Sequence, residues 1–191
     1  MNRNDIIFKK MPISALLGCS LLIVSSGAGA FEGVVCEPRY IAMDYTRPAD
    51  APPACPPSTR VTRSYTLCAP SSLIAGKEPA PLVLAFHGAG DSSSATAFQN
   101  RVQFEARGGE ERFVTVYPNG CRLVNRQLIC DGGNWNAQGD PPRGVSERCK
   151  VDDMGFIDEV MKDLTVNLNY KFSKIVAFGH SKGGIDDDHV D

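Results

Sequence analysis

Three short apolar runs, each bounded by turn residues, constrain the fold of this chain more than any other feature. They are PLVLAF at 81–86, FVTVY at 113–117 and KIVAF at 174–178. A strand that is buried on both faces of a sheet reads as a continuous apolar run, whereas a half-buried strand alternates apolar and polar residues. Alternation of this second kind occurs in residues 61–70. We therefore predict several strands, the central ones covered on both faces.

Helical patterns separate the predicted strands. Residues 92–109 combine a serine cluster, apolar residues at helical spacing and a glycine pair that is expected to end the helix. A second helix is predicted to begin at Asp152 or Asp153, either of which is a suitable N-cap. Its buried face is expected to carry Ile157, Val160, Met161, Leu164 and Leu168. Strands that alternate with helices predict an α/β fold, with a mostly parallel sheet flanked by helices.

The first 30 residues are predicted to be a signal peptide. Basic residues precede an apolar stretch at 13–24, which is shorter than the ~18–20 residues of a membrane span. Ala28 and Ala30 have the A-x-A arrangement, so cleavage is expected after Ala30 and the protein is expected to be secreted or periplasmic. A lipid anchor at Cys19 is the alternative, because LLGC at 16–19 is similar to a bacterial lipoprotein site.

Composition divides the rest of the chain. Residues 31–60 are rich in proline and cysteine, and we predict an irregular lead-in there. Residues 61–184 are predicted to form the α/β domain, in which 121–150 would be a long loop. Residues 185–191 form an acidic tail.

Six cysteines lie beyond residue 30: Cys36, Cys55, Cys68, Cys121, Cys130 and Cys149. An even number in an exported chain favours disulfides over metal ligation, and the chain has no C-x-x-C motif and only three histidines. Many pairings are open, and we predict only one, Cys121 with Cys130, which would close a short loop. No metal is expected. The net charge of −2 gives no electrostatic basis for binding nucleic acid or an anionic membrane.

The last apolar run leads into Gly179-His180-Ser181-Lys182-Gly183. A G-x-S-x-G sequence after a buried strand is typical of a nucleophile elbow, a sharp turn that lifts the serine hydroxyl above the sheet. The glycines allow the backbone to crowd at that turn. Ser181 is therefore the predicted nucleophile, and an ordinary glycine-rich turn is the alternative.

The run at 81–86 ends in His87-Gly88-Ala89-Gly90. A loop of small residues after a buried strand is suited to donate a backbone N–H to an oxyanion, together with the N–H that follows the nucleophile. The predicted donors are the N–H groups of Ala89 (or Gly88) and of Lys182. His87 is expected to stabilise its own loop by hydrogen bonding and not to act as the general base.

Taken in order, PLVLAFHGAG, FVTVYPNG, VDDMGFIDEVMKDL and GHSKGG resemble the secreted polyhydroxybutyrate depolymerase and feruloyl esterase group of α/β-hydrolases, over residues 61–184. The resemblance implies an exported serine carboxylic-ester hydrolase that needs no cofactor and acts on a polyester, hydroxyalkanoate or aryl ester. It implies Ser181 as nucleophile and the turn after His87 as the oxyanion loop. It also places Trp135 where such enzymes carry an aromatic residue near the site, with loop packing as the alternative. Lys182 departs from the expected asparagine, a difference without effect if only its backbone N–H acts.

In this fold the triad acid and base follow the nucleophile, on loops after later strands. We find no such strands after Gly184 and expect a partial α/β-hydrolase, with the strand at 174–178 at the sheet edge. His189 is eight residues past Ser181, about 12 Å along a helix, which exceeds the reach of a general base. His180 is expected to point away from the Ser181 hydroxyl. Weak or no turnover is therefore expected.

Two alternatives to an active esterase stay open. One is a non-catalytic remnant with the same architecture. The other is a disulfide-tied binding module formed by residues 31–150. The oligomeric state is not predicted by the sequence.

Overall fold

A computed structural model of the chain describes residues 33–73, 77–90, 93–137, 142 and 144–184, together with the backbone of residues 6–8. The acidic tail, Cys19 and most of the predicted signal peptide lie outside the described residues. In chain order the elements are β1 (Ile6–Phe8), β2 (Val34–Tyr45), β3 (Thr59–Pro70), β4 (Pro79–Phe86), α1 (Ala95–Val102), α2 (Phe104–Glu111), β5 (Val114–Pro118), β6 (Cys121–Val124), β7 (Gln127–Asn134), α3 (Val145–Arg148), α4 (Asp153–Lys162), a π-helical turn (Asp163–Asn167), β8 (Lys171–Gly179) and a 3-10 turn (Ser181–Gly183).

The strands form one sheet in the order β1-β8-β4-β5-β3-β7-β6, with β2 paired to β3. The three predicted apolar runs are β4, β5 and β8, which lie side by side and run parallel. β3 pairs antiparallel with both β5 and β2. The predicted α/β class with a mostly parallel sheet is confirmed. The expectation that the strand at 174–178 forms an edge is wrong for residues 175–177, because β1 pairs with them in parallel.

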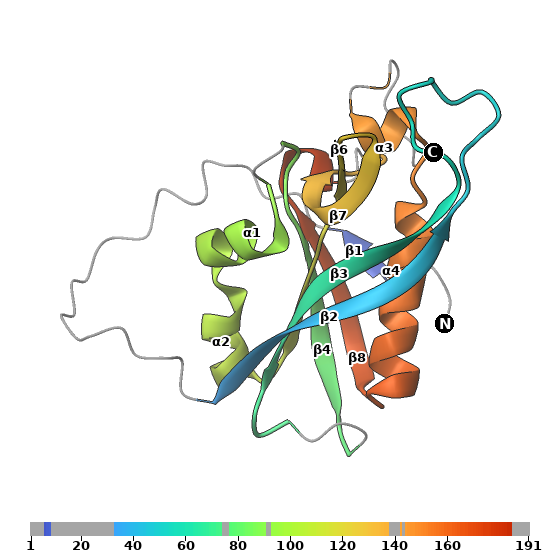
Figure 1. Cartoon of the computed structure of the whole chain (residues 1–191). Coiled ribbons are helices and arrows are strands. Elements are labelled where there is room, and N and C mark those ends of the chain that lie inside the picture. The colour runs from blue at the N-terminus through green and yellow to red at the C-terminus, as the bar shows by residue number, and fades with distance from the viewer. Residues whose placement is uncertain are drawn as a thin grey trace.

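Helices cover both faces of the sheet, with α1 and α2 on one side and α4 on the other (Figure 1). One core lies under α4 and includes Leu82, Leu84, Val116, Phe156, Ile157, Val160, Leu164 and Ile175. The core under α1 includes Ala85, Ala95, Phe98 and Tyr117, with Phe178 packed against it. The predicted inward face of α4 is confirmed, since Met161 and Leu168 also pack against the first core. Asp152 is the N-cap, and its side chain accepts a hydrogen bond from the Gly155 N–H.

The prediction that residues 31–60 are irregular is wrong in its first half. β2 pairs with β3 along its whole length, and residues 39–45 alternate between inward and exposed positions. Pro38 lies within β2, which is tolerated because β2 pairs on one side only. The stretch that is rich in proline, residues 46–58, has neither helix nor strand.

The prediction of a long loop at 121–150 is also wrong. β6 and β7 form a hairpin whose two turn residues, Asn125 and Arg126, both have positive φ. Positive φ at both positions is the geometry that best matches the twist of the flanking strands. The helix predicted within residues 92–109 is instead two helices, α1 and α2. Gln103 separates them with a left-handed φ of 48°, and the glycine pair at 108–109 lies inside α2.

Three disulfides join all six cysteines of the described chain: Cys36–Cys68, Cys55–Cys149 and Cys121–Cys130. The single predicted pair is confirmed. Three disulfides are typical of proteins from oxidising compartments, such as the periplasm or the extracellular space. No helix within the described ranges has the length and apolar character needed to cross a membrane, and the same ranges hold no group of three or more side chains suited to bind a metal ion.

Candidate active site

The predicted elbow is a tight turn directly after β8. β8 ends at Gly179, His180 remains extended, and Ser181, the first residue of the 3-10 turn, adopts a left-handed φ of 53°. A serine in this conformation is uncommon and is maintained only where the surrounding structure enforces it. The turn therefore places the Ser181 side chain at the carboxyl end of a parallel strand, on an exposed bend.

Two glycines enforce this bend. A Cβ atom at Gly179 would overlap the backbone carbonyl of Gly183, and a Cβ atom at Gly183 would overlap the carbonyl oxygen of His87. Both clashes involve backbone atoms, which cannot rotate away as a side chain does. The two outer positions of the G-x-S-x-G sequence thus accept only glycine, as a nucleophile elbow requires.

The loop after β4 lies against the elbow. The His180 N–H donates to the Phe86 carbonyl at 3.2 Å, which joins the ends of the two neighbouring strands. A Cβ atom placed on Gly88 would lie 3.5 Å from the Ser181 Cβ. Among the described residues, no acceptor is found for the backbone N–H groups of Gly88, Ala89 or Lys182. Both predicted segments therefore meet, and their N–H groups are free to bind an oxygen.

A pocket of about 430 Å³ opens at this junction. Its wall is formed by the loop 87–89, by His180 and Ser181, and by residues of α1 and its N-cap. His180 lines the same pocket as the serine, with its ring near Gly88. No hydrogen bond joins its ring to the Ser181 hydroxyl among the described residues, and the expected direction of the ring, away from that hydroxyl, stays a prediction.

His87 is buried, and both of its ring nitrogens are engaged within the loop. Nδ1 lies 2.6 Å from the Gly88 carbonyl oxygen, and Nε2 accepts a hydrogen bond of 3.0 Å from the Gly120 N–H. A single neutral tautomer, protonated at Nδ1, satisfies both contacts. Burial lowers the pKa of His87 and so favours this neutral form. These contacts agree with the structural role that we expected for His87.

Trp135 lies beneath the loop and does not line the pocket. It is buried, its indole N–H donates to the His87 carbonyl at 2.9 Å, and its ring packs edge-on against Phe86. This position agrees with the packing alternative for Trp135 and not with a contact to substrate.

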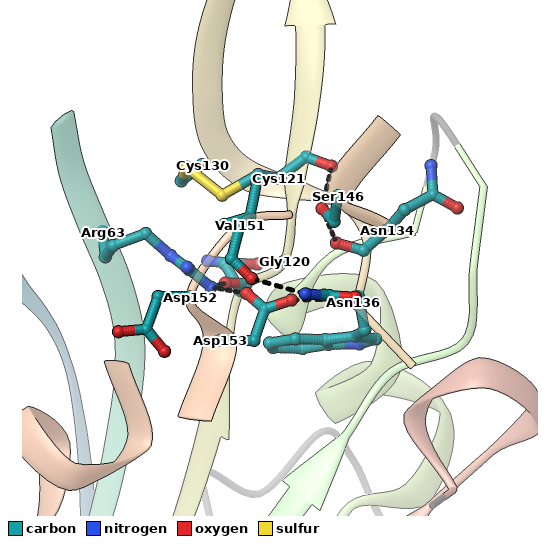
Figure 2. A network of polar contacts seen from close by, with 12 residues as sticks. Arg63, Gly120, Cys121, Cys130, Asn134, Asn136, Ser146, Val151, Asp152 and Asp153 are labelled. Carbon is teal, nitrogen blue, oxygen red and sulfur yellow. Dashed lines mark hydrogen bonds and ion pairs between the residues drawn. A yellow bond between two sulfur atoms is a disulfide. The ribbon is translucent and has the colours of Figure 1, made fainter. Parts of the chain in front are cut away.

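A buried charge pair supports the segment that carries Trp135 (Figure 2). Arg63 and Asp153 are paired at 2.6 Å, and Arg63 also donates to the Asn119 carbonyl. The other oxygen of Asp153 accepts the Asn136 N–H at 2.5 Å, so that Arg63 and Asn136 hold the carboxylate from two sides. The Arg63 guanidinium lies 4.1 Å from the centre of the Phe156 ring. The loop is thus linked through its neighbours to β3 and to the start of α4.

A second buried carboxylate reaches the elbow itself. Glu147, on α3, pairs with the Lys182 ammonium group at 2.7 Å, and its other oxygen accepts the Gly144 N–H at 3.0 Å. Cys149, the C-cap of α3, is bonded to Cys55. The lysine that differs from the expected asparagine therefore ties the turn to a disulfide-anchored helix. Nothing in the sequence signals this pair, because its members are far apart in the chain.

The Ser181 hydroxyl has no hydrogen-bond partner in the part of the chain that the structure describes. His87 is excluded as its base because both ring nitrogens already have partners. His189 and the rest of the acidic tail at 185–191 lie outside the described residues.

No protein-family model matches the chain, and a search of curated proteins gives no match. Solved structures that it is similar to include an S-formylglutathione hydrolase from Agrobacterium tumefaciens, with a TM-score of 0.46 and 17% identity over 83% of this chain and 53% of that one. FphF, a fluorophosphonate-binding serine hydrolase of Staphylococcus aureus, has a TM-score of 0.42 and 18% identity over 76% of this chain and 48% of that one. The peroxisomal alpha-beta-hydrolase Lpx1 of Saccharomyces cerevisiae has a TM-score of 0.44 and 15% identity over 80% of this chain and 38% of that one.

The chain spans about half the length of the first of these structures.

Proposed function

We propose that the protein is an exported serine carboxylic-ester hydrolase of the polyhydroxybutyrate depolymerase and feruloyl esterase type, with Ser181 as its nucleophile. The observation that carries this proposal is the bend at Ser181. Its left-handed backbone and the glycines that admit no Cβ are the features that expose a nucleophile at the end of a parallel strand. Removal of residues 1–30 from the exported chain is part of the proposal. It would also remove β1, so that residues 175–177 of β8 would then lie at the sheet edge.

The free N–H groups supply the second element of ester hydrolysis. When the Ser181 oxygen attacks an ester carbonyl, negative charge develops on the carbonyl oxygen. Donors that are already oriented toward that oxygen stabilise the charge without reorganisation, and each is worth about 10²–10³ in rate. The N–H groups of Lys182 and of Ala89 (or Gly88) are placed on the two segments that meet at the pocket. We assign the oxyanion site to them.

The attack also requires that the serine proton be accepted. No described residue is in hydrogen-bond contact with the hydroxyl, so the described residues provide the proposed nucleophile and oxyanion site but not the base. This observation favours a second candidate, a non-catalytic protein with the same architecture.

A fluorophosphonate probe separates the two candidates, because it reports the reactivity of the serine without requiring turnover. The exported, purified chain should be labelled once, at Ser181. Its intact mass should match a chain that begins at Phe31. It should also hydrolyse p-nitrophenyl acetate above background, and Ser181→Ala should abolish both reactions. A chain that is folded but unlabelled, with the same background hydrolysis as Ser181→Ala, is the outcome that supports the non-catalytic candidate.

The third function considered, a binding module formed by residues 31–150, is disfavoured by the core. Phe156 and Val160 on α4, Leu164 in the π-helical turn and Ile175 on β8 are buried in one core with residues of β4 and β5. Removal of residues 151–184 would expose that surface, so residues 31–150 are not expected to fold alone.

A further inference from the structure

We propose that Arg101 forms a carboxylate-binding subsite in the pocket beside Ser181, and that the protein prefers esters whose acyl or alcohol part ends in a carboxylate. The preference for an ester rests on the proposed function. The subsite itself rests on the residues that line the pocket.

One face of α1 forms a wall of the pocket. Ser94, Ala97, Phe98 and Arg101 all line it, and they occur at i, i+3, i+4 and i+7, which is the spacing of a single helix face. Ser93 fixes which end of this wall meets the oxyanion loop, because its hydroxyl donates to the Ala89 carbonyl. The seven residues from Ser94 to Arg101 correspond to about 10 Å along the helix. The wall therefore leads from the reacting group to the arginine.

Arg101 supplies the charge of this wall. Among the described residues that line the pocket, there is no aspartate or glutamate to balance it. Arg101 is exposed and makes no ion pair with any described residue, whereas the next arginine along the chain, Arg107, pairs with Glu111. The N-terminus of α1, which carries a partial positive charge, faces the same pocket. An anionic group on a ligand would thus meet an unpaired cation.

The middle of the wall is apolar. Ala97 and Phe98 lie between the polar ends, and the Phe98 ring stacks on Phe178 with 6.0 Å between ring centres. The matching ligand has a carbonyl at Ser181, a short alkyl segment over Ala97 and Phe98, and a carboxylate at Arg101. Half-esters of short dicarboxylic acids have this pattern, and so do hydroxyacid oligomers with a free acid end.

Binding to the full chain carrying Ser181→Ala tests the subsite without hydrolysis. In an NMR titration, monomethyl glutarate should bind about threefold to fivefold more tightly than dimethyl glutarate, the range of a partly exposed ion pair. The preference should fall at high salt. Adding Arg101→Gln to the Ser181→Ala chain should remove the preference for the monoester. Adding Arg107→Gln instead, on the neighbouring helix α2, should leave that preference unchanged.

Chain length provides an independent readout. If both ends of the ligand are held, affinity within the monomethyl succinate, glutarate and adipate series should peak at one length. An even increase with each methylene, or an unchanged preference in Arg101→Gln, would overturn the subsite. Fluorophosphonate labelling of Ser181 without any preference for the monoester overturns the subsite alone. An Arg101-dependent preference without any labelling overturns the proposed esterase function alone.

Discussion

The two halves of the candidate site are held in place by different means. The elbow is fixed by its own backbone, because Gly179 and Gly183 approach neighbouring carbonyl groups more closely than any side chain permits. The proposed oxyanion loop contains small residues and is fixed from below by side chains, through His87, Trp135 and the buried pair of Arg63 and Asp153. A motif of five consecutive residues encodes the first half, whereas the second depends on partners 90 residues apart.

This difference predicts where each half can be disrupted. A substitution inside the motif should disturb the elbow and leave the rest of the fold in place. A substitution in the buried pair of Arg63 and Asp153, far from the pocket, should destabilise the whole domain. It should affect the site only indirectly, through the position of Trp135.

The largest effect is expected from Arg63→Met, which leaves the Asp153 carboxylate buried without its partner. Breaking a buried pair on one side costs about 3–5 kcal/mol of unfolding free energy, measurable by urea denaturation. Arg63→Met with Asp153→Asn should recover at least ~1 kcal/mol, because the amide oxygen still accepts the Asn136 N–H.

Arg60→Met is the matched control for that variant. Arg60 lies on the same strand and pairs with Asp44, but both side chains are mostly exposed. Its loss should cost less than ~1 kcal/mol. Equal losses for Arg60→Met and Arg63→Met would show that the buried network does not support the fold as we describe.

A smaller effect on stability is expected from Gly183→Ala, which tests the elbow. The new methyl group would overlap the His87 carbonyl oxygen and force the turn to shift. Overpacking of this kind costs about 1–3 kcal/mol. Labelling of Ser181 by a fluorophosphonate should be lost even where the protein stays folded, because the serine no longer faces the oxyanion donors.

Gly109→Ala is the control for the elbow variant. Gly109 lies inside α2, where alanine is more favourable than glycine by about 0.5–1 kcal/mol. Its labelling should equal that of the parent chain. If Gly183→Ala is labelled at the parent rate, the close approach at the elbow is not needed to present the serine.

The contrast between the two halves also explains what the sequence was able to predict. β4, β5, β8 and α4 were predicted because each is encoded by a local pattern, an apolar run or an amphipathic stripe. The meeting of Gly88 with Ser181 followed from those strands, since the carboxyl ends of parallel neighbours lie together.

The missed features depend on contacts that local patterns do not record. β2 was missed because Pro38 and the cysteines obscured its alternation, and its identity as a strand comes from pairing with β3. The break between α1 and α2 occurs at a glutamine in a left-handed conformation, while the glycine pair stays helical. Likewise, the contact of Glu147 with Lys182 joins two distant elements.

The smallest effect expected here concerns pH and distinguishes the loop from the elbow. Burial keeps His87 neutral, with a pKa below that of an unfolded histidine, about 6.5. As the pH falls below that value, the unfolded chain binds a proton that the folded chain resists, so the free energy of unfolding decreases. The slope from one such group is at most about 1.4 kcal/mol per pH unit.

His87→Gln removes the titrating group, and its unfolding free energy should change less between neutral and mildly acidic pH than that of the parent. Gly183→Ala retains His87 and should keep the parent's slope. If the unfolding free energy of His87→Gln depends on pH as steeply as that of the parent, other groups cause the acid sensitivity. The two halves of the site would then not differ in their response to pH.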